Sequence, residues 1–300
     1  MKALARYGRY ALAAGLIFTS GAVLAQDVPS LLKGLLGGGG STSGSSGGSN
    51  LDRAASIAGN VGKALKEPSE QEEIAIGQQF ASSLLGAKPL WNNPGAQRYV
   101  NTLGRWIASQ TERPDLPWTF GVLDDTGYNA FATPGGYIFV TKGLLQRMGS
   151  EAELAGVLGH EIGHVLKKHH LNAVRKGAGL AILGEVVSAK AGGNPQVNEF
   201  VKNGILNVFG SGLSKSDEYE ADRIGVVLAA RAGYDPFGLP SALQMLEGQS
   251  GNDASFSLMF ATHPTPASRL EELDKLMDAK FDALPHVQGK LVKDRLREFR

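Results

Sequence analysis

The stretch His160-Glu161-Ile162-Gly163-His164 decides how this chain is interpreted, because it places two imidazoles four residues apart with a carboxylate directly after the first. On an α-helix a step of four residues rotates by only ~40° and rises ~6 Å, so both histidines face the same side and can bind one metal ion. A zinc ion bound by two histidines and a carboxylate keeps a position for water and lowers its pKa, and Glu161 is placed to take the proton. The motif therefore predicts metal-assisted peptide hydrolysis.

The residues before and within this motif are those of a helix. Ser150-Glu151-Ala152-Glu153 has the pattern of a capping box. Apolar residues follow at three- and four-residue steps: Leu154, Val157, Leu158, Ile162 and Val165. Two purely structural histidines on a buried helix are the alternative, but that arrangement would also bury Glu161 with no partner for its charge, which is costly. A metal site on a helix is the favoured interpretation.

An extended zinc motif of the metzincin type is disfavoured. His170 stands six residues after His164, as that motif requires, but the chain must leave the helix at a residue that is usually glycine, and here it is Lys167. A continued helix would carry His170 away from the site. His169 and His170 are therefore predicted to be surface or packing residues at the helix end.

The acidic segment from Asp217 to Asp222 is the better source of a third ligand. Glu218 and Asp222 are four residues apart and share one face of a predicted helix. Taken alone, such a face is usually solvated surface. With two metal-binding histidines upstream, Glu218 is predicted to complete a site of two histidines and one glutamate, while Asp222 holds a ligand imidazole through its free N–H.

The first 25 residues have the pattern of a cleavable secretory signal peptide. Lys2, Arg6 and Arg9 precede an apolar run over residues 11–18, and small residues precede Gln26. A retained membrane anchor is the alternative, but the apolar run is well short of the ~20 residues that span a bilayer. The chain has no cysteine, which excludes disulfides, a catalytic thiol and thiolate ligands. These features predict a bacterial, periplasmic protein.

Composition and charge narrow the class of protein further. Hydrophobic residues make up 42% and charged residues 20% of the chain, as in ordinary globular proteins. The net charge is +1, so removal of the three basic residues of the signal leaves about −2. Nucleic acid is therefore not an expected partner, because binding it would need a clustered basic face.

We expect three regions along the chain. Residues 1–25 are the signal peptide, residues 26–50 a disordered Gly/Ser-rich linker, and residues 51–300 a zinc metallopeptidase domain with a short charged C-terminal tail. Further helices are predicted over residues 69–85, 95–110, 178–191, 197–208, 215–232, 240–248 and 266–279. The fold class is α+β, a mainly helical zincin-type domain with one small β-sheet beside the helix of the motif.

Two β-strand regions are predicted before the motif helix. Residues 118–123 are apolar and β-prone, and residues 130–133 and 137–140 flank the turn Pro134-Gly135-Gly136. An edge strand near Asn129, Ala130, Phe131, Ala132 and Thr133 could pair with an extended substrate through backbone hydrogen bonds. A purely structural hairpin is an equally good interpretation of the strands alone.

Several ordered motifs resemble a known family. They are Asn129-Ala130-Phe131-Ala132 with Gly135-Gly136, the helix of His160, Glu161 and His164, the segment from Glu218 to Asp222, and His263-Pro264 followed by Arg269. From about residue 69 to 270 the chain resembles the HtpX-like and CAAX prenyl protease-like gluzincin zinc metallopeptidases. It is most similar to soluble periplasmic BepA-like members, although it lacks their helical repeat tail.

The resemblance implies roles for individual residues. It makes His160, His164 and Glu218 the ligands of one Zn²⁺, Glu161 the catalytic base and proton shuttle, and Asp222 the residue that orients a ligand histidine. It also implies peripheral association with the outer-membrane assembly machinery.

Two residues have more than one interpretation. By the same resemblance, His263 corresponds to a histidine of BepA-like proteins that is thought to approach the metal as a removable fourth ligand, which would gate activity. It could instead stabilise the oxyanion of the reaction intermediate or cap the following helix. Arg269 is either a salt-bridge partner or a residue that steers substrate.

The sequence thus predicts a zinc-dependent metalloendopeptidase. The expected substrates are unfolded or misfolded cell-envelope proteins, in the role of protein quality control. The alternative is a chaperone-like holdase on a zinc protease scaffold, which binds clients without cutting them. Such a scaffold has no need of Glu161, so the presence of this residue favours the enzyme.

Overall fold

The computed structural model describes residues 67–176, 212–248, 263–277 and 279–298. The predicted signal peptide and linker, and the helices predicted over residues 178–191 and 197–208, lie outside these ranges.

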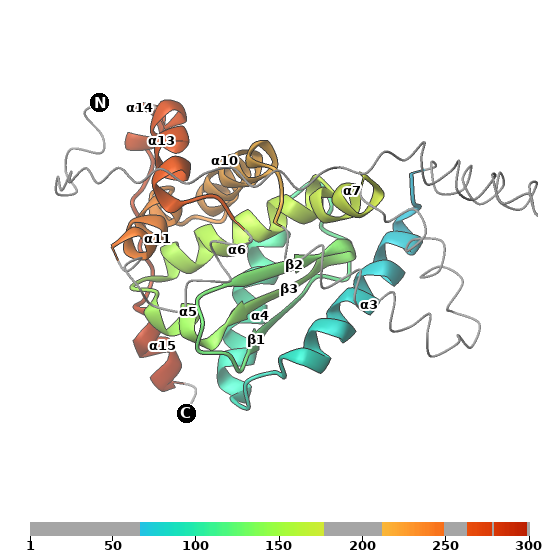
Figure 1. The fold of residues 1–300 in the computed structure, drawn as a ribbon. Helices are drawn as coiled ribbons and strands as arrows, with labels where there is room; N and C mark the ends of the chain where they lie inside the picture. Colours follow the sequence, from blue (N-terminus) through green and yellow to red (C-terminus); the bar gives the residue numbers. More distant parts are fainter. Residues whose placement is uncertain (1–66, 177–211, 249–262, 278, 299–300) are drawn as a thin grey trace, which may run out of the picture. The chain divides into compact units, whose positions relative to one another are not determined.

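The described part of the chain is a mainly helical α+β domain with one small sheet, as predicted (Figure 1). None of its helices combines the length and the apolar character needed to cross a membrane. The five other helices predicted outside the motif correspond to α3, α4, α10, α11 and α13, and no bound differs by more than three residues.

The elements before the motif helix supply the sheet. They are α3 (Glu70–Ala87), α4 (Pro94–Ala108), β1 (Thr119–Leu123), β2 (Ala130–Thr133), the 3-10 helix η2 (Pro134–Gly136), β3 (Tyr137–Thr141) and α5 (Lys142–Arg147). The motif helix and the elements after it supply the rest. They are α6 (Glu151–Leu166), α7 (His169–Lys176), α10 (Lys215–Arg231), α11 (Gly238–Glu247), α13 (Pro266–Leu276), α14 (Ala279–Asp282) and α15 (Val292–Glu298).

The three strands pair in the order β1-β3-β2. Strands β2 and β3 form the predicted antiparallel hairpin, and β1 pairs in parallel with β3. Gly135 and Gly136 make the turn with φ of 74° and 99°, a region that favours glycine. A Cβ on Gly135 would also lie 2.6 Å from Ile74 Cα, so the turn fits closely against α3. Strand β2 is left at the edge, next to α6 (Figure 1).

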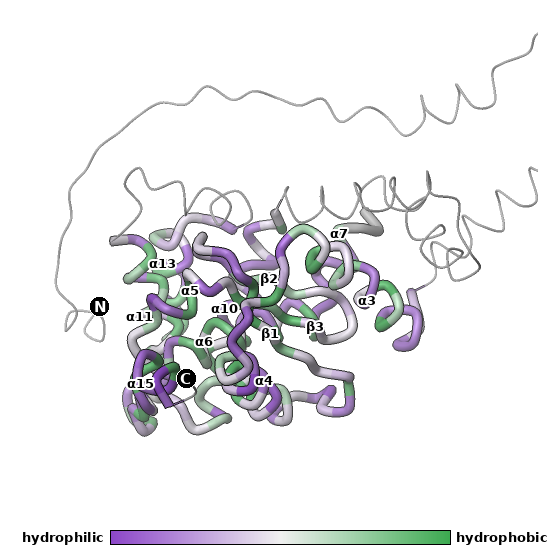
Figure 2. The backbone as a smooth tube through the Cα atoms, turned by 90° about the horizontal axis from the view of Figure 1, so that it is seen from below, coloured by the Kyte–Doolittle hydropathy of each residue, from purple (hydrophilic) through white to green (hydrophobic). Residues whose placement is uncertain are grey.

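The alternation of side chains along the strands divides the core in two. Phe120, Ile138 and Val140 lie in the larger cluster, with α4, α6, α10 and α11. Phe131 and Phe139 point to the opposite face and pack against α3 in a smaller cluster. In Figure 2 the strands and α6 are largely hydrophobic, whereas α15 is mainly hydrophilic. The sheet therefore forms one wall of the core that surrounds the motif helix.

Both ends of α6 differ in detail from the prediction. The Ser150 hydroxyl caps the helix by accepting the Glu153 N–H, but the Glu153 carboxylate accepts the N–H of Gly149 rather than that of Ser150. The capping box is therefore only half formed. At the other end, the expectation of a continued helix is wrong, because α6 ends at Leu166 and Lys168 adopts a φ of 55°. The chain turns there and α7 begins at His169.

The C-terminal segment packs on the start of α6. Val292 is fully buried, and Arg295 Nε donates to Glu151 Oε1 over 2.7 Å. The backbone N–H of Glu151 also donates to the carbonyl of Lys290. Through residue 298, the predicted charged tail is thus helical and in contact with the helix that carries the motif.

Candidate metal centre

Helices α6 and α10 approach each other closely at glycines, and this contact assembles the site. A Cβ on Gly159 would lie 2.9 Å from the carbonyl oxygen of Gly225, and a Cβ on Gly225 would lie 2.8 Å from the backbone nitrogen of His160. Side chains at these positions would therefore push the helices apart. The close crossing brings the face of α10 that carries Glu218 and Asp222 against the two histidines of α6.

Two ring nitrogens and the carboxylate of Glu218 have spacings close to those of ligands on a tetrahedral metal ion. His160 Nε2 lies 3.1 Å from His164 Nε2. Glu218 reaches the same place, with Oε2 at 3.7 Å from His160 Nε2 and Oε1 at 3.6 Å from His164 Nε2. Two atoms that each bind a tetrahedral zinc at 2.0–2.1 Å lie roughly 3.3 Å apart. All three side chains are buried, and two imidazoles with one carboxylate fit a zinc ion.

Glu218 is a buried carboxylate whose hydrogen bonding within the described residues is incomplete. Its side chain is fully buried, and Oε1 has no hydrogen-bond partner there. Burial alone would raise the pKa of Glu218, but the charge and hydrogen bond of His263 lower that pKa to about 2. An ionised, buried oxygen without a partner is unfavourable unless a cation binds it.

Asp222 and Arg269 hold the first histidine. Asp222 Oδ1 lies 2.9 Å from His160 Nδ1, and the Arg269 guanidinium donates to both oxygens of Asp222. All three side chains are buried. Although burial opposes ionisation, the Arg269 charge holds the pKa of Asp222 well below its usual range. Arg269 thus forms a buried salt bridge with Asp222, and it also lines the pocket described below.

His263 lies in the same cluster as the predicted ligands. Its Nδ1 is 2.7 Å from Glu218 Oε2, and one ligand atom from each of His160, His164, Glu218 and His263 can be chosen so that all four lie within 4.8 Å of one another. Burial lowers the pKa of His263, but the charge and hydrogen bond of Glu218, together with the charge of Glu161, raise this pKa above its usual value. The following helix α13 has Thr265 at its N-cap, so His263 does not take the capping role.

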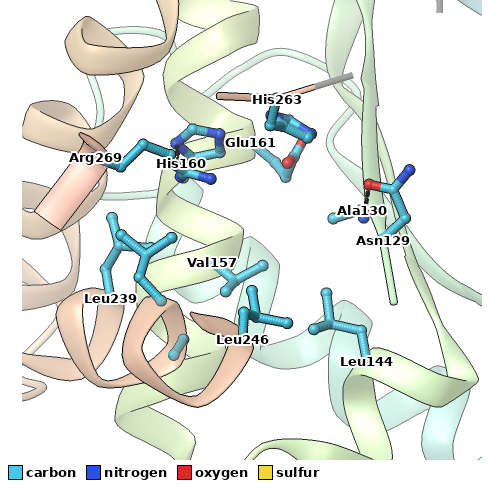
Figure 3. Close-up of a pocket in the computed structure, with 12 residues that line it drawn as sticks. Asn129, Ala130, Leu144, Val157, His160, Glu161, Leu239, Leu246, His263 and Arg269 are labelled. Carbon is cyan, nitrogen blue, oxygen red and sulfur yellow. Dashed lines mark hydrogen bonds between the residues drawn. The ribbon is translucent and has the colours of Figure 1, made fainter. Parts of the chain in front are cut away.

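Glu161 borders a pocket beside the two histidines. The pocket is also lined by apolar side chains from α5, α6 and α11, among them Leu144, Val157 and Leu246 (Figure 3). Burial raises the pKa of Glu161, which brings this carboxylate closer to the range in which it can accept and release a proton near neutrality. The carboxylate of Glu161 thus lines the same partly apolar pocket as His160 and His263.

Strand β2 has backbone groups that point away from β3, on the side next to the pocket. Thr141 N donates to Asn129 O, so Asn129, Phe131 and Thr133 hydrogen-bond to β3 while Ala130 and Ala132 direct their backbone groups away from it. The N–H of Ala130 donates to the Asn129 side-chain oxygen, and the Asn129 Nδ2 has no partner among the described residues. Asn129 and Ala130 both line the pocket (Figure 3).

Sequence reasoning missed His169 as part of the site. The turn at Lys168 directs the imidazole of His169 toward α6, so that His169 Nδ1 lies 2.9 Å from His164 Nδ1. The His169 side chain is buried. Its Nε2 lies 3.3 Å from Glu220 Oε2. The sequence signal for this contact was a histidine five residues after His164. That signal is useful only if the chain turns at Lys168, and no glycine there indicates a turn.

Comparison with known proteins gives one family. Residues 94–277, which include all the site residues above, match the model of peptidase family M48. The chain is 32% identical over 210 residues to the beta-barrel assembly-enhancing protease of Yersinia pestis, and 31% identical over 210 residues to that of Escherichia coli strain K12. Each match covers 67% of this chain and 43% of the relative.

A eukaryotic relative matches a smaller share of the chain. The mitochondrial metalloendopeptidase OMA1 of Arabidopsis thaliana is 34% identical over 167 residues, which is 54% of this chain and 32% of that protein. The chain thus matches less than half the length of these relatives.

Proposed function

The chain belongs to peptidase family M48, a family of metallopeptidases, and on this premise we propose that it is a zinc-dependent metalloendopeptidase. One observation carries the proposal. His160 Nε2 and His164 Nε2 converge with the buried carboxylate of Glu218, whose Oε1 has no hydrogen-bond partner within the described residues, and the buried carboxylate of Glu161 lies beside them. One Zn²⁺ per chain would be held by His160, His164 and Glu218.

The residues of the site divide the work of hydrolysis among them. Zn²⁺, when bound, would polarise the scissile carbonyl and lower the pKa of a water molecule. Glu161 takes the proton from the attacking water and passes it to the leaving amine. Its raised pKa suits both transfers, because the group must accept and then release a proton near neutrality. Asp222 keeps the proton of His160 on Nδ1, so that Nε2 has its lone pair free for the metal.

The edge of β2 would hold the substrate. The backbone groups of Ala130 and Ala132 that point away from β3 can pair with an extended peptide as an added strand. Asn129 would release the Ala130 N–H to the substrate and turn its own amide, whose Nδ2 has no partner among the described residues, to the peptide. Main-chain pairing of this kind accepts many sequences, which suits unfolded polypeptides.

The apolar pocket would select a substrate side chain next to the scissile bond. Leu144, Val157 and Leu246 line it, and Glu161 stands at its border. An apolar side chain buried there gains about 25 cal/mol for each Å² removed from water. We therefore expect cleavage beside apolar residues, which are exposed in unfolded proteins and buried in folded ones.

The predicted signal peptide and the relatives support a proposal for the setting of this activity. The predicted signal peptide over residues 1–25, with the linker over 26–50 and the peptidase domain over 51–300, supports export to the bacterial periplasm. The name of the Yersinia pestis relative links that protein to beta-barrel assembly. Unfolded or misfolded cell-envelope proteins are the substrates we propose, with peripheral association at the outer-membrane assembly machinery.

His263 would regulate access to the metal. Its contact with Glu218 and its membership of the same cluster of possible ligands support this role. The resting enzyme would then be blocked until the segment that carries His263 moves away.

The experiment that tests the proposal is degradation of an unfolded protein by zinc-loaded residues 26–300. We expect cleavage that is lost with a chelator, restored by zinc, and reduced at least about 1,000-fold by Glu161→Gln, with zinc affinity and thermal unfolding unchanged. Zinc binding without any Glu161-dependent cleavage, by wild type or by His263→Ala, would favour the holdase alternative.

A further inference from the structure

The two histidines of the motif are held by different kinds of partner. His160 Nδ1 contacts the carboxylate of Asp222, which is itself paired with Arg269. His164 Nδ1 instead contacts another imidazole, that of His169, over 2.9 Å. His164 and His169 are both buried, so water does not readily replace this contact. The second histidine thus depends on a residue outside the motif.

The protonation of both rings follows from the geometry. His164 Nε2 faces His160 Nε2 and Glu218, so a metal there requires its lone pair, and the proton of the neutral ring must sit on Nδ1. His169 Nδ1 must then accept this proton in a hydrogen bond. A neutral His169 consequently carries its own proton on Nε2.

The acidic side chains of α10 suit that arrangement. His169 Nε2 lies 3.3 Å from Glu220 Oε2 and 3.7 Å from Asp217 Oδ1, so its N–H has a carboxylate acceptor. Glu220 is in turn paired with Lys167 over 2.9 Å. Contacts therefore run without a break from Lys167 through Glu220 and His169 to His164.

We propose that His169 is a positioning residue for His164. His169 Nδ1 accepts the hydrogen bond from His164 Nδ1–H. Glu220 orients His169 by accepting a hydrogen bond from His169 Nε2–H. The inference rests on the proposed metal site and adds a second supporting pair to that of Asp222 and Arg269. Hydrogen bonds of this kind fix the orientation of a ligand ring and increase its basicity, and their loss costs metal affinity.

The first test compares two substitutions at His169 in full-length protein. His169→Asn places an amide oxygen near the position of Nδ1 and keeps the acceptor, whereas His169→Phe keeps the ring and removes the acceptor. Zinc affinity is measured by competition with a chromogenic chelator, and ligand geometry by the visible spectrum of the Co²⁺-loaded protein. His286→Asn is the matched control, since it removes another histidine that contacts a carboxylate, Asp235, outside the metal cluster.

We expect His169→Phe to weaken zinc binding about 10- to 100-fold and to change the Co²⁺ spectrum. His169→Asn should stay within about threefold of wild type, and His286→Asn should match it. Equal zinc affinities in the Phe and Asn variants, whether both normal or both weakened, would overturn the proposal. They would mean that zinc affinity does not depend on a hydrogen-bond acceptor at position 169.

A second test covers the case in which His169→Phe fails to fold. Glu220 is part-exposed, so Glu220→Ala leaves the core intact. It should weaken zinc binding about threefold in the wild-type background and not at all beside His169→Asn, whose shorter side chain ends before Glu220. Equal effects in both backgrounds would show that Glu220 acts independently of His169. Wild-type protein that binds no zinc would overturn the metal site itself rather than this assignment.

Discussion

Two fully buried glutamates, Glu73 on α3 and Glu218 on α10, show how the same group serves structure in one place and function in another. Glu73 is surrounded by donors. Both of its oxygens accept from Arg113, and the N–H of Gly135 donates to Oε1. Glu218 accepts from His263 at Oε2, while its Oε1 has no partner within the described residues. A buried carboxylate with an oxygen that lacks a hydrogen-bond partner, such as Glu218, thus indicates a bound cation more strongly than a fully hydrogen-bonded carboxylate such as Glu73.

The largest expected effect separates the two glutamates by metal binding. Glu218→Gln should lower zinc affinity by at least about 1,000-fold and abolish cleavage, because a neutral amide replaces an anionic ligand. The metal-free variant should still fold, because the amide oxygen of glutamine can accept from His263 as the carboxylate does. Isothermal titration with zinc and urea unfolding in a chelator measure the two effects. Normal zinc affinity in this variant would remove Glu218 from the site.

The reverse outcome is expected at the other glutamate. Glu73→Gln should lower the free energy of unfolding by about 2–3 kcal/mol, because it leaves the Arg113 charge without its buried partner. Zinc affinity should not change. Glu70→Gln is the matched control, since Glu70 contacts the same arginine but is 60% exposed and should cost less than about 0.5 kcal/mol. A similar small loss from both substitutions would mean that burial does not strengthen the pair.

A smaller effect compares the partners of the two glutamates. The partner of Glu73 is the guanidinium of Arg113, whereas the partner of Glu218 is the imidazole of His263. If His263 blocks the metal in the resting enzyme, His263→Ala should increase the rate of cleavage about two- to tenfold, and the added activity should vanish in a double variant with Glu161→Gln. A protein no more active than wild type would show that His263 does not restrain the enzyme.

The smallest effect concerns a third buried carboxylate, Asp235, whose partner His286 is about half exposed. The hydrogen bond from His286 to Asp235 raises the pKa of His286. The protonated ring should therefore stabilise the fold fully below pH ~6.5, and this contribution should disappear as the pH rises through the higher pKa of the folded state. Because the pair is screened by solvent, we expect about 0.5 kcal/mol or less.

Urea unfolding of wild type and His286→Asn between pH 6 and pH 9 measures this effect. The difference in the free energy of unfolding between the two proteins should shrink as the pH rises. A difference that is constant over this range would show that the contact does not depend on the charge of His286.

The local pattern of the sequence was sufficient for most of the fold. Helix periodicity, N-cap residues and the glycine turn gave α3, α4, α6, α10, α11, α13 and the hairpin, because these elements depend on residues close together in the chain. The same reasoning placed His160 and His164 on one helix face. It could not show that β1 pairs in parallel with β3, since that pairing joins strands separated by another strand.

The sequence by itself determined the chemistry of this protein, since the residue types and the four-residue spacing of His160 and His164 require only a helix. The tertiary structure decided which distant groups complete the site. Glu218 lies beside the two histidines because α6 and α10 cross closely at glycines. His169 contacts His164 because the chain turns at Lys168. Such contacts depend on packing between segments far apart in sequence and on a backbone angle that the residue type does not specify, so only the folded chain reveals them.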